Sequence, residues 1–161
     1  MEHQVRPRRR GFLGWLAGSA GLLALGRGAQ ARNEHPAFLF GEPAHKVVYQ
    51  FNQAGPDYMD HVLFSVGELV RKYGDDIHLV ITAFGPGIHI LGKRPERPVP
   101  KRVREQVSSL AMYGVEFHAC GNTLRALDWD KNDLVDFATV VDVGAADLIR
   151  LQEQGYAYIS W

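Results

Sequence analysis

The sequence predicts an α/β domain built on a mainly parallel sheet that helices cover on both faces. From residue 45 onward, five β-rich segments alternate with helical segments, which is the pattern of a parallel sheet joined by right-handed crossovers. The segment 77–84 is almost continuously apolar, as a strand buried on both faces must be. A chain of 161 residues with 46% hydrophobic and 22% charged residues has the composition of one globular domain.

The first strand and helix are predicted within residues 45–73. Residues 45–52 (HKVVYQFN) are rich in β-branched and aromatic side chains and form the expected first strand. Pro56 and Asp57 suit the start of a helix, which we expect over 58–73 and which Gly74 ends. The apolar residues of this helix recur at the period that buries one face, namely Val62, Leu63, Val66, Leu69 and Val70.

The second strand, at 77–84, is expected to lie at the centre of the sheet and to end at Gly85-Pro86-Gly87. A tight turn explains this tripeptide better than a phosphate cradle, because it lacks the full glycine fingerprint and the lysine of nucleotide-binding loops. A short apolar piece (88–91) and a proline-rich loop (93–100) lead to a helix over 100–113. The face that this helix is expected to bury holds Val103, Val107, Leu110 and Ala111.

The third strand is expected at 115–119, because its side chains alternate between two chemical types. Val115, Phe117 and Ala119 fall on one side, and Glu116 and His118 fall on the other. Later elements are a short helix at 124–127, a helical turn within 131–137, a strand at 139–143, a helix at 144–154 and a strand at 156–159. The buried face of the last helix is expected to hold Ala145, Leu148, Ile149 and Gln152.

The first 31 residues have the order of an export signal: a basic region, an apolar region and a small-residue cleavage site. Arg8-Arg9-Arg10-Gly11-Phe12-Leu13 contains the twin-arginine pattern, and Ala29-Gln30-Ala31 supplies the cleavage site. The apolar part, at 12–25, would be only about 21 Å long as a helix, too short for a bilayer core of about 30 Å. We therefore expect a periplasmic protein that has no membrane segment after cleavage, with an arm at 32–44 before a domain at 45–161.

Charge and cysteine content exclude several classes of function. The formal net charge of zero includes five arginines and one glutamate in residues 1–31, so the remainder has 18 − 5 = 13 basic and 18 − 1 = 17 acidic residues, a net of −4. A mildly acidic body argues against nucleic acid as the main partner. The single cysteine, Cys120, excludes an internal disulfide and multi-cysteine zinc or iron–sulfur sites within one subunit. No motif for an organic cofactor is present, and we expect none.

Candidate site residues follow three of the predicted strands. In a parallel sheet, ligands gather at the carboxyl ends of the strands, so these segments should meet at one edge. The candidates for ligand binding are Asn52 after the first strand, Gly85, Gly87 and His89 after the second, and Gly121, Asn122 and Thr123 after the third.

Cys120 is the strongest candidate for chemistry at this edge. It should lie where a strand ends and a helix begins, and the positive end of a helix favours the thiolate form of cysteine. His118 lies on the same side of the strand and would favour the thiolate or relay a proton, while the backbone amides of Asn122 and Thr123 would hold an anion. The alternative is that Cys120 is a small, buried packing residue.

Four segments of the chain resemble the DsrE/DsrF-like family: VVYQFN, VITAFGPGIHIL, YGVEFHACGNTL and VVDVGAADLIRLQEQGYAYI. The resemblance covers residues 45–159 and is to the branch of small, often exported members. It implies a three-layer α/β/α fold with a five-stranded parallel sheet whose first strand lies near the middle. It also implies homo-oligomers, commonly trimers or hexamers. In sulfur-relay members, one cysteine carries persulfide sulfur between a donor and an acceptor protein.

Three hypotheses for function remain open from the sequence. In the first, Cys120, assisted by His118, carries sulfur as a persulfide. In the second, the protein is a non-catalytic oligomeric module that binds a small ligand or a partner, and Cys120 is structural. In the third, His89, His118 and Cys120 hold a metal, but their spacing has no metal-site signature, and we predict no metal. Whether the protein is an enzyme with its own turnover stays open.

Overall fold

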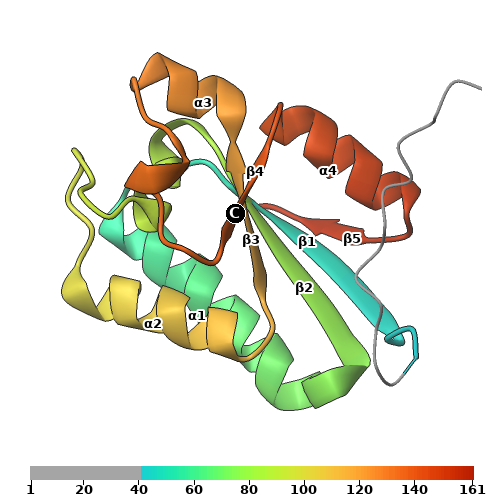
Figure 1. The fold of residues 1–161 in the computed structure, drawn as a ribbon. Coiled ribbons are helices and arrows are strands. Elements are labelled where there is room, and N and C mark those ends of the chain that lie inside the picture. The colour runs from blue at the N-terminus through green and yellow to red at the C-terminus, as the bar shows by residue number, and fades with distance from the viewer. Residues whose placement is uncertain (1–40) are drawn as a thin grey trace, which may run out of the picture. The chain divides into compact units, whose positions relative to one another are not determined.

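The computed structural model describes residues 41–161, and Figure 1 shows their fold. The predicted export signal and most of the arm lie outside the described residues. The strands are β1 (His45–Phe51), β2 (Ile77–Ala83), β3 (Glu116–Cys120), β4 (Ala138–Val141) and β5 (Ala157–Ile159). The α-helices are α1 (Pro56–Tyr73), α2 (Lys101–Met112), α3 (Gly121–Ala126) and α4 (Gly144–Glu153). Three 3₁₀ helices are η1 (Gly74–Asp76), η2 (Gly85–Leu91) and η3 (Lys131–Asp133). Within residues 41–161, no helix is both long and apolar enough to cross a bilayer.

The five strands form one parallel sheet in the order β4-β3-β2-β1-β5, which confirms the predicted α/β fold. The apolar strand β2 lies at the centre, as its sequence predicts, and β1 lies beside it. Helices α1 and α2 cover one face of the sheet, and α4 covers the other (Figure 1). All carboxyl ends of the strands therefore point to one edge, where α3 and α4 begin.

The two faces of the sheet differ in how apolar they are. The face under α1 and α2 holds the large core, with fully buried residues such as Tyr49, Phe51 and Leu63. The apolar cluster under α4 is much smaller and consists of Val48, Val80, Leu148, Leu151 and Tyr156, with Phe84 packed against it. Because so few apolar residues lie under α4, polar side chains make up much of the remaining contact between this helix and the sheet.

The buried face of α4 differs from the prediction. Leu148 is buried as expected, but Ile149 is 57% exposed, and Ala145 and Gln152 are also exposed. Asp147 and Leu151 are buried instead. The prediction was wrong because it assigned the inward face by hydrophobicity alone, whereas a buried carboxylate with polar partners occupies one of the inward positions. Smaller differences concern element ends: α3 begins at Gly121, β4 ends at Val141, and residues 85–91 form η2.

Candidate functional site

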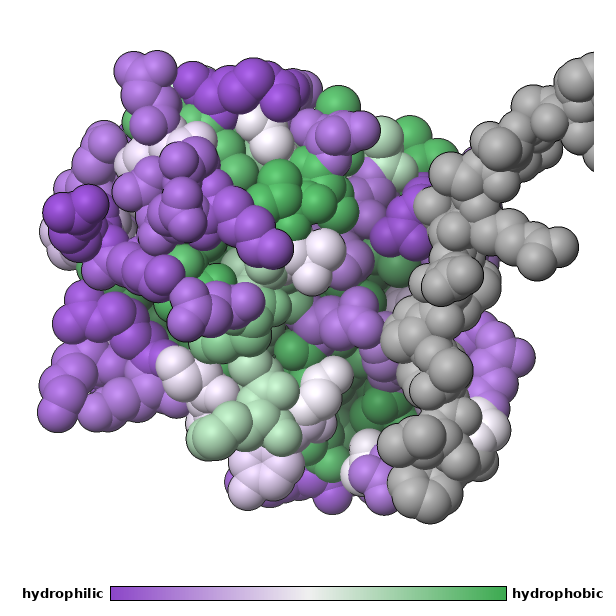
Figure 2. All heavy atoms as spheres, viewed as in Figure 1, coloured by the Kyte–Doolittle hydropathy of each residue, from purple (hydrophilic) through white to green (hydrophobic). Residues whose placement is uncertain are grey.

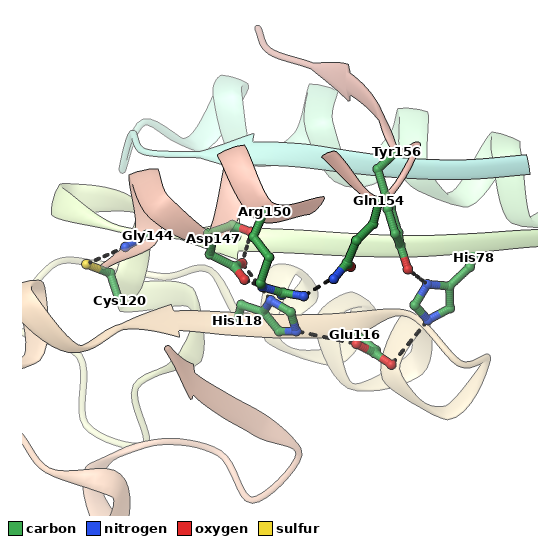
Figure 3. Close-up of polar contacts among 10 residues, drawn as sticks. His78, Glu116, His118, Cys120, Gly144, Asp147, Arg150, Gln154 and Tyr156 are labelled. Carbon is green, nitrogen blue, oxygen red and sulfur yellow. Dashed lines mark hydrogen bonds and ion pairs between the residues drawn. The ribbon is translucent and has the colours of Figure 1, made fainter. Parts of the chain in front are cut away.

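Cys120 ends β3 and directly precedes α3, at the strand–helix junction that the sequence predicts. The residue is 5% exposed. The backbone N–H of Gly144, the first residue of α4, donates a hydrogen bond to its Sγ across 3.2 Å. Figure 3 shows this contact at one end of a row of polar side chains. The sulfur therefore faces the beginning of α4, as well as lying at the beginning of α3.

These contacts favour the thiolate form of Cys120. Burial raises the pKa of the thiol, but the hydrogen bond from Gly144 and the backbone N–H and hydroxyl of Thr123 lower it, and the net effect is a pKa below the ordinary value. Helix N-termini carry partial positive charge, which acts in the same direction. A lowered pKa increases the fraction of thiolate, the nucleophilic form of cysteine, at neutral pH.

The predicted meeting of the second and third strand ends is present in the structure. The N–H of Gly85 donates to Oγ1 of Thr123 across 3.0 Å, which joins the turn after β2 to the residues after Cys120. The N–H of Asn122 donates to the carbonyl of Asp142 across 3.2 Å, so this amide already has a partner. Gly121 is buried, and a Cβ there would lie 3.1 Å from the Val141 carbonyl oxygen.

Gly85 and Gly87 have structural reasons to be glycine. Gly85 has a φ of +51°, in the left-handed region that favours glycine. A Cβ on Gly87 would lie 2.3 Å from the carbonyl oxygen of Phe51, so η2 passes directly over the end of β1. Gly85-Pro86-Gly87 is therefore a tight turn that packs onto the end of β1.

Asn52 is tied to the side chain of Tyr58 at the end of β1. The N–H of Asn52 donates to the Tyr58 hydroxyl across 3.2 Å, and that hydroxyl donates to the Gln50 carbonyl across 3.0 Å. The ring of Tyr58 also packs edge-on against Phe51, with 5.1 Å between centroids. These contacts fix the connection between β1 and α1.

His118 points to the same face of the sheet as Cys120, as the alternation predicts, and both of its ring nitrogens are bonded to carboxylates. Nδ1 donates to Oδ2 of Asp147 across 2.7 Å, and Nε2 lies 3.3 Å from Oε2 of Glu116. Burial alone would lower the pKa of His118, but these two carboxylates outweigh it and raise the pKa to about 9. His118 is therefore an imidazolium at neutral pH. Its ring nitrogens contact Asp147 and Glu116 rather than Cys120.

The polar row continues from His118 in both directions (Figure 3). On one side, Oε1 of Glu116 accepts from Nε2 of His78 across 3.1 Å, and Nδ1 of His78 shares a 2.6 Å hydrogen bond with the Tyr156 hydroxyl. Hydrogen bonds from His118 and His78 lower the pKa of Glu116 to about 2. His78 is thus a hydrogen-bonded core residue, which is what its place in an apolar strand indicates.

On the other side of His118, Asp147 is the centre of the network. Its Oδ2 also accepts from the Thr82 hydroxyl across 2.9 Å, and its Oδ1 accepts from Arg150 across 2.5 Å. Burial raises the pKa of Asp147, but pairing with His118 outweighs this and leaves it below the ordinary value. Asp147 and Arg150 are not among the site residues predicted from the sequence. The sequence signal that could have identified Asp147 is its position, since it is an acidic residue three positions after Gly144. This places it on the turn of α4 that faces His118.

His89 lies apart from this network. It is 2% exposed and packs edge-on against Trp129, with 5.2 Å between the ring centroids at 90°. Its Nδ1 has no hydrogen-bond partner among the described residues. In residues 41–161, no group of three or more His, Cys, Asp or Glu side chains is placed to hold a metal ion. The structure thus does not assemble His89, His118 and Cys120 into the metal set considered from the sequence.

The model of the DsrE/DsrF-like family matches residues 40–161, which is the whole of the α/β domain. The chain belongs to the DsrE/DsrF-like family. Its membership confirms the resemblance that the four sequence segments carry, and this family is associated with sulfur relay. No curated protein sequence matches the chain significantly.

Solved structures of similar proteins share the DsrE-like fold. A protein of unknown function from Methanobacterium thermoautotrophicum has a TM-score of 0.65 and 28% identity, covering 73% of this chain and 99% of its own. The ychN protein from E. coli has a TM-score of 0.56 and 13% identity, with coverages of 73% and 99%. A conserved protein of unknown function from Bacteroides thetaiotaomicron has a TM-score of 0.56 and 13% identity, with coverages of 72% and 94%. At 13% identity, the last two show the fold alone.

Proposed function

We propose that this DsrE-like protein is a periplasmic sulfur carrier in which Cys120 holds sulfur as a persulfide. The observation that carries the proposal is the hydrogen bond from Gly144 N–H to Cys120 Sγ at the sheet edge where ligands gather. It stabilises the negative sulfur that must act as the nucleophile. Membership in a family associated with sulfur relay supports the same chemistry.

The transfer needs no outside oxidant or reductant. The Cys120 thiolate attacks the terminal sulfur of a donor persulfide, R–S–SH. The new bond joins Sγ to that sulfur, the S–S bond of the donor breaks, and the donor leaves as the thiolate RS⁻. The proton stays on the transferred sulfur, which leaves Cys120 as Cys–S–SH. An acceptor thiolate then attacks the terminal sulfur and releases the Cys120 thiolate.

The surface beside the sulfur suits a protein donor or acceptor. Figure 2 shows apolar side chains at the surface over the connection between β4 and α4, in the upper centre of the view. Val143, the residue before Gly144, belongs to this connection and is 39% exposed. Exposed apolar groups next to a reactive residue favour docking of a partner protein. The role of His118 in this proposal is electrostatic and structural, because its nitrogens are bonded to Asp147 and Glu116.

Loading and release of sulfur test this proposal. Purified mature protein is incubated with polysulfide or a low-molecular-weight persulfide, and its intact mass is measured. We expect a gain of one sulfur atom that a small thiol removes, and no gain in Cys120→Ser. A native free thiol that never gains sulfur under these conditions would contradict the carrier proposal.

A second candidate function rests on the low exposure of Cys120, which is 5%. Here the protein is a non-catalytic binding module, and Cys120 packs between β3 and α4. Free cysteine is often a small buried residue, which supports this candidate. It predicts that Cys120→Ser keeps the biological function of the protein and that the folded protein resists alkylation. The carrier proposal predicts that Cys120→Ser abolishes function.

Export and assembly are part of the proposal. The twin-arginine pattern and the Ala29-Gln30-Ala31 site support cleavage after Ala31 and a periplasmic location. N-terminal sequencing of the periplasmic protein tests this, and a sequence beginning at Met1 would contradict it.

Trimers or hexamers are supported by large exposed apolar side chains on α1 and after α2, namely Phe64 and Tyr113. Light scattering of the mature protein would test assembly, and a monomeric mass would contradict it.

A further inference from the structure

The first turn of α4 is attached to the sheet mainly through one buried carboxylate. Asp147 is 4% exposed and lies three residues after Gly144. Its two oxygens accept hydrogen bonds from Thr82 on β2 at 2.9 Å, from His118 on β3 at 2.7 Å and from Arg150 on α4 itself at 2.5 Å. Two of these donors belong to adjacent strands, so the carboxylate connects α4 to both.

The end of β4 also holds the start of α4: Val141 pairs with Cys120, and the N–H of Asn122 donates to the Asp142 carbonyl. The buried apolar residues of this helix are Leu148 and Leu151, both of which come after Asp147. Gly144 has no side chain to hold its position, and a Cβ there would lie 3.2 Å from the Cβ of Cys120. The distance between the Gly144 N–H and Sγ therefore depends on where the whole first turn of α4 is held.

We propose that Asp147 is a positioning residue for Cys120: by fastening α4 to Thr82 and His118, it keeps the Gly144 N–H on the sulfur. This inference rests on the proposed function, in which the Cys120 thiolate is the nucleophile. Asp147 does not touch the sulfur and acts only through the position of α4. Its hydrogen bond from Thr82 and its ion pair with His118 connect the first turn of α4 to β2 and β3.

A variant that removes a hydrogen bond to Asp147 but no charge separates positioning from electrostatics. If Asp147 acted only as a nearby negative charge, its removal would favour the thiolate and lower the pKa of Cys120. Removal would also lower the pKa of His118, because Asp147 is one of the two carboxylates that raise it, and loss of the positive charge on His118 would raise the pKa of Cys120. If Asp147 acts by holding α4, its removal weakens the hydrogen bond from Gly144 and raises the pKa of Cys120. Thr82→Val therefore separates the two explanations, because it removes a hydrogen bond that holds Asp147 to β2 and removes no charge.

The experiment measures the pKa of Cys120 from the ultraviolet absorbance of its thiolate, with the titration of Cys120→Ser subtracted to remove the tyrosine signal. The variants are Asp147→Ala, Thr82→Val and, as a matched control, Glu153→Gln, which removes an exposed carboxylate from the same helix. We expect the pKa to rise by about one pH unit in Asp147→Ala, or roughly tenfold less thiolate well below the pKa. It should rise by a smaller amount in Thr82→Val and stay constant in Glu153→Gln.

An unchanged or lowered Cys120 pKa in folded Asp147→Ala, or an unchanged one in folded Thr82→Val, would overturn the inference. Circular dichroism establishes which variants are folded, and if Asp147→Ala does not fold, Thr82→Val decides by the same criterion. Asp147→Asn adds a rescue test: it keeps an oxygen that accepts from Thr82 and His118, so its Cys120 pKa should lie closer to wild type than that of Asp147→Ala. Failure of the proposed function is seen separately, as wild-type protein with a free Cys120 thiol that gains no sulfur from polysulfide or a persulfide.

Discussion

The N–H of Gly144 lies 3.2 Å from the Sγ of Cys120 and donates to it, which joins the last residue of β3 to the first residue of α4. The two residues are 24 positions apart in the chain, so this contact exists only because the parallel sheet brings β3 and the end of β4 together.

Gly144→Ala should disturb the thiol directly. The added Cβ would lie 3.0 Å from the Phe84 ring and 3.2 Å from the Cβ of Cys120, so these neighbours or α4 itself must move slightly. We expect a loss of about 1–2 kcal/mol in the free energy of unfolding and a raised Cys120 pKa. Gly67→Ala is the control, because nothing lies within 4 Å of a Cβ there; it should stabilise α1 by about 0.5–1 kcal/mol. Equal Cys120 titrations in Gly144→Ala and wild type would contradict the account.

Gly87→Ala tests whether this glycine is structural. Its Cβ would lie 2.3 Å from the carbonyl oxygen of Phe51, a backbone atom that cannot move without disturbing β1. We expect urea denaturation to show a loss of about 3 kcal/mol. If the variant is as stable as wild type, the close approach of η2 to β1 is not a requirement of the fold, and a ligand-binding role for Gly87 regains support.

The stability of the domain should depend on pH through Glu116 and His118. Glu116 has a lowered pKa, from 4.5 to about 2, so its contribution is present above 4.5 and is lost as the pH falls toward 2. His118 has a raised pKa, from 6.5 to about 9, so its contribution is complete below 6.5 and is lost as the pH rises through 9.

Urea denaturation at neutral and alkaline pH values measures the contribution of His118 to stability. Between pH values of about 6 and about 9.5, we expect the free energy of unfolding to fall by up to about 3 kcal/mol. His118→Gln should remove most of this alkaline decrease, because the variant has no group with a raised pKa at this position. The exposed-site variant Glu153→Gln should keep it. An unfolding free energy that is constant up to pH values of about 9.5 would contradict the assignment of His118 as a buried imidazolium.

The elements that the sequence predicts well are those with a local signal. The apolar run of β2 marks the central strand, and the alternation before Cys120 marks a strand that ends at a helix. The same alternation correctly places His118 and Cys120 on one face. These features depend on neighbouring residues along the chain, whose periodicity can be counted directly.

The polar network under α4 was not predictable in this way. Asp147 belongs to α4, His118 to β3 and Thr82 to β2, and no local pattern says that these three meet. Hydrophobicity alone therefore predicts that Ile149 of α4 faces inward, whereas the structure buries Asp147 and exposes Ile149. The error has a physical cause: a carboxylate can be buried when donors on neighbouring strands satisfy it, and those donors are found only in three dimensions.

The measurement that tests the central claim most directly is the intact mass of the mature protein isolated from the periplasm, before and after a mild reductant, with peptide mapping of Cys120. The account predicts that part of the protein carries one additional sulfur atom on Cys120, that the reductant removes it, and that Cys120→Ser carries none. An unmodified thiol that also resists alkylation in the folded protein would contradict sulfur carriage and favour the binding module with a structural Cys120.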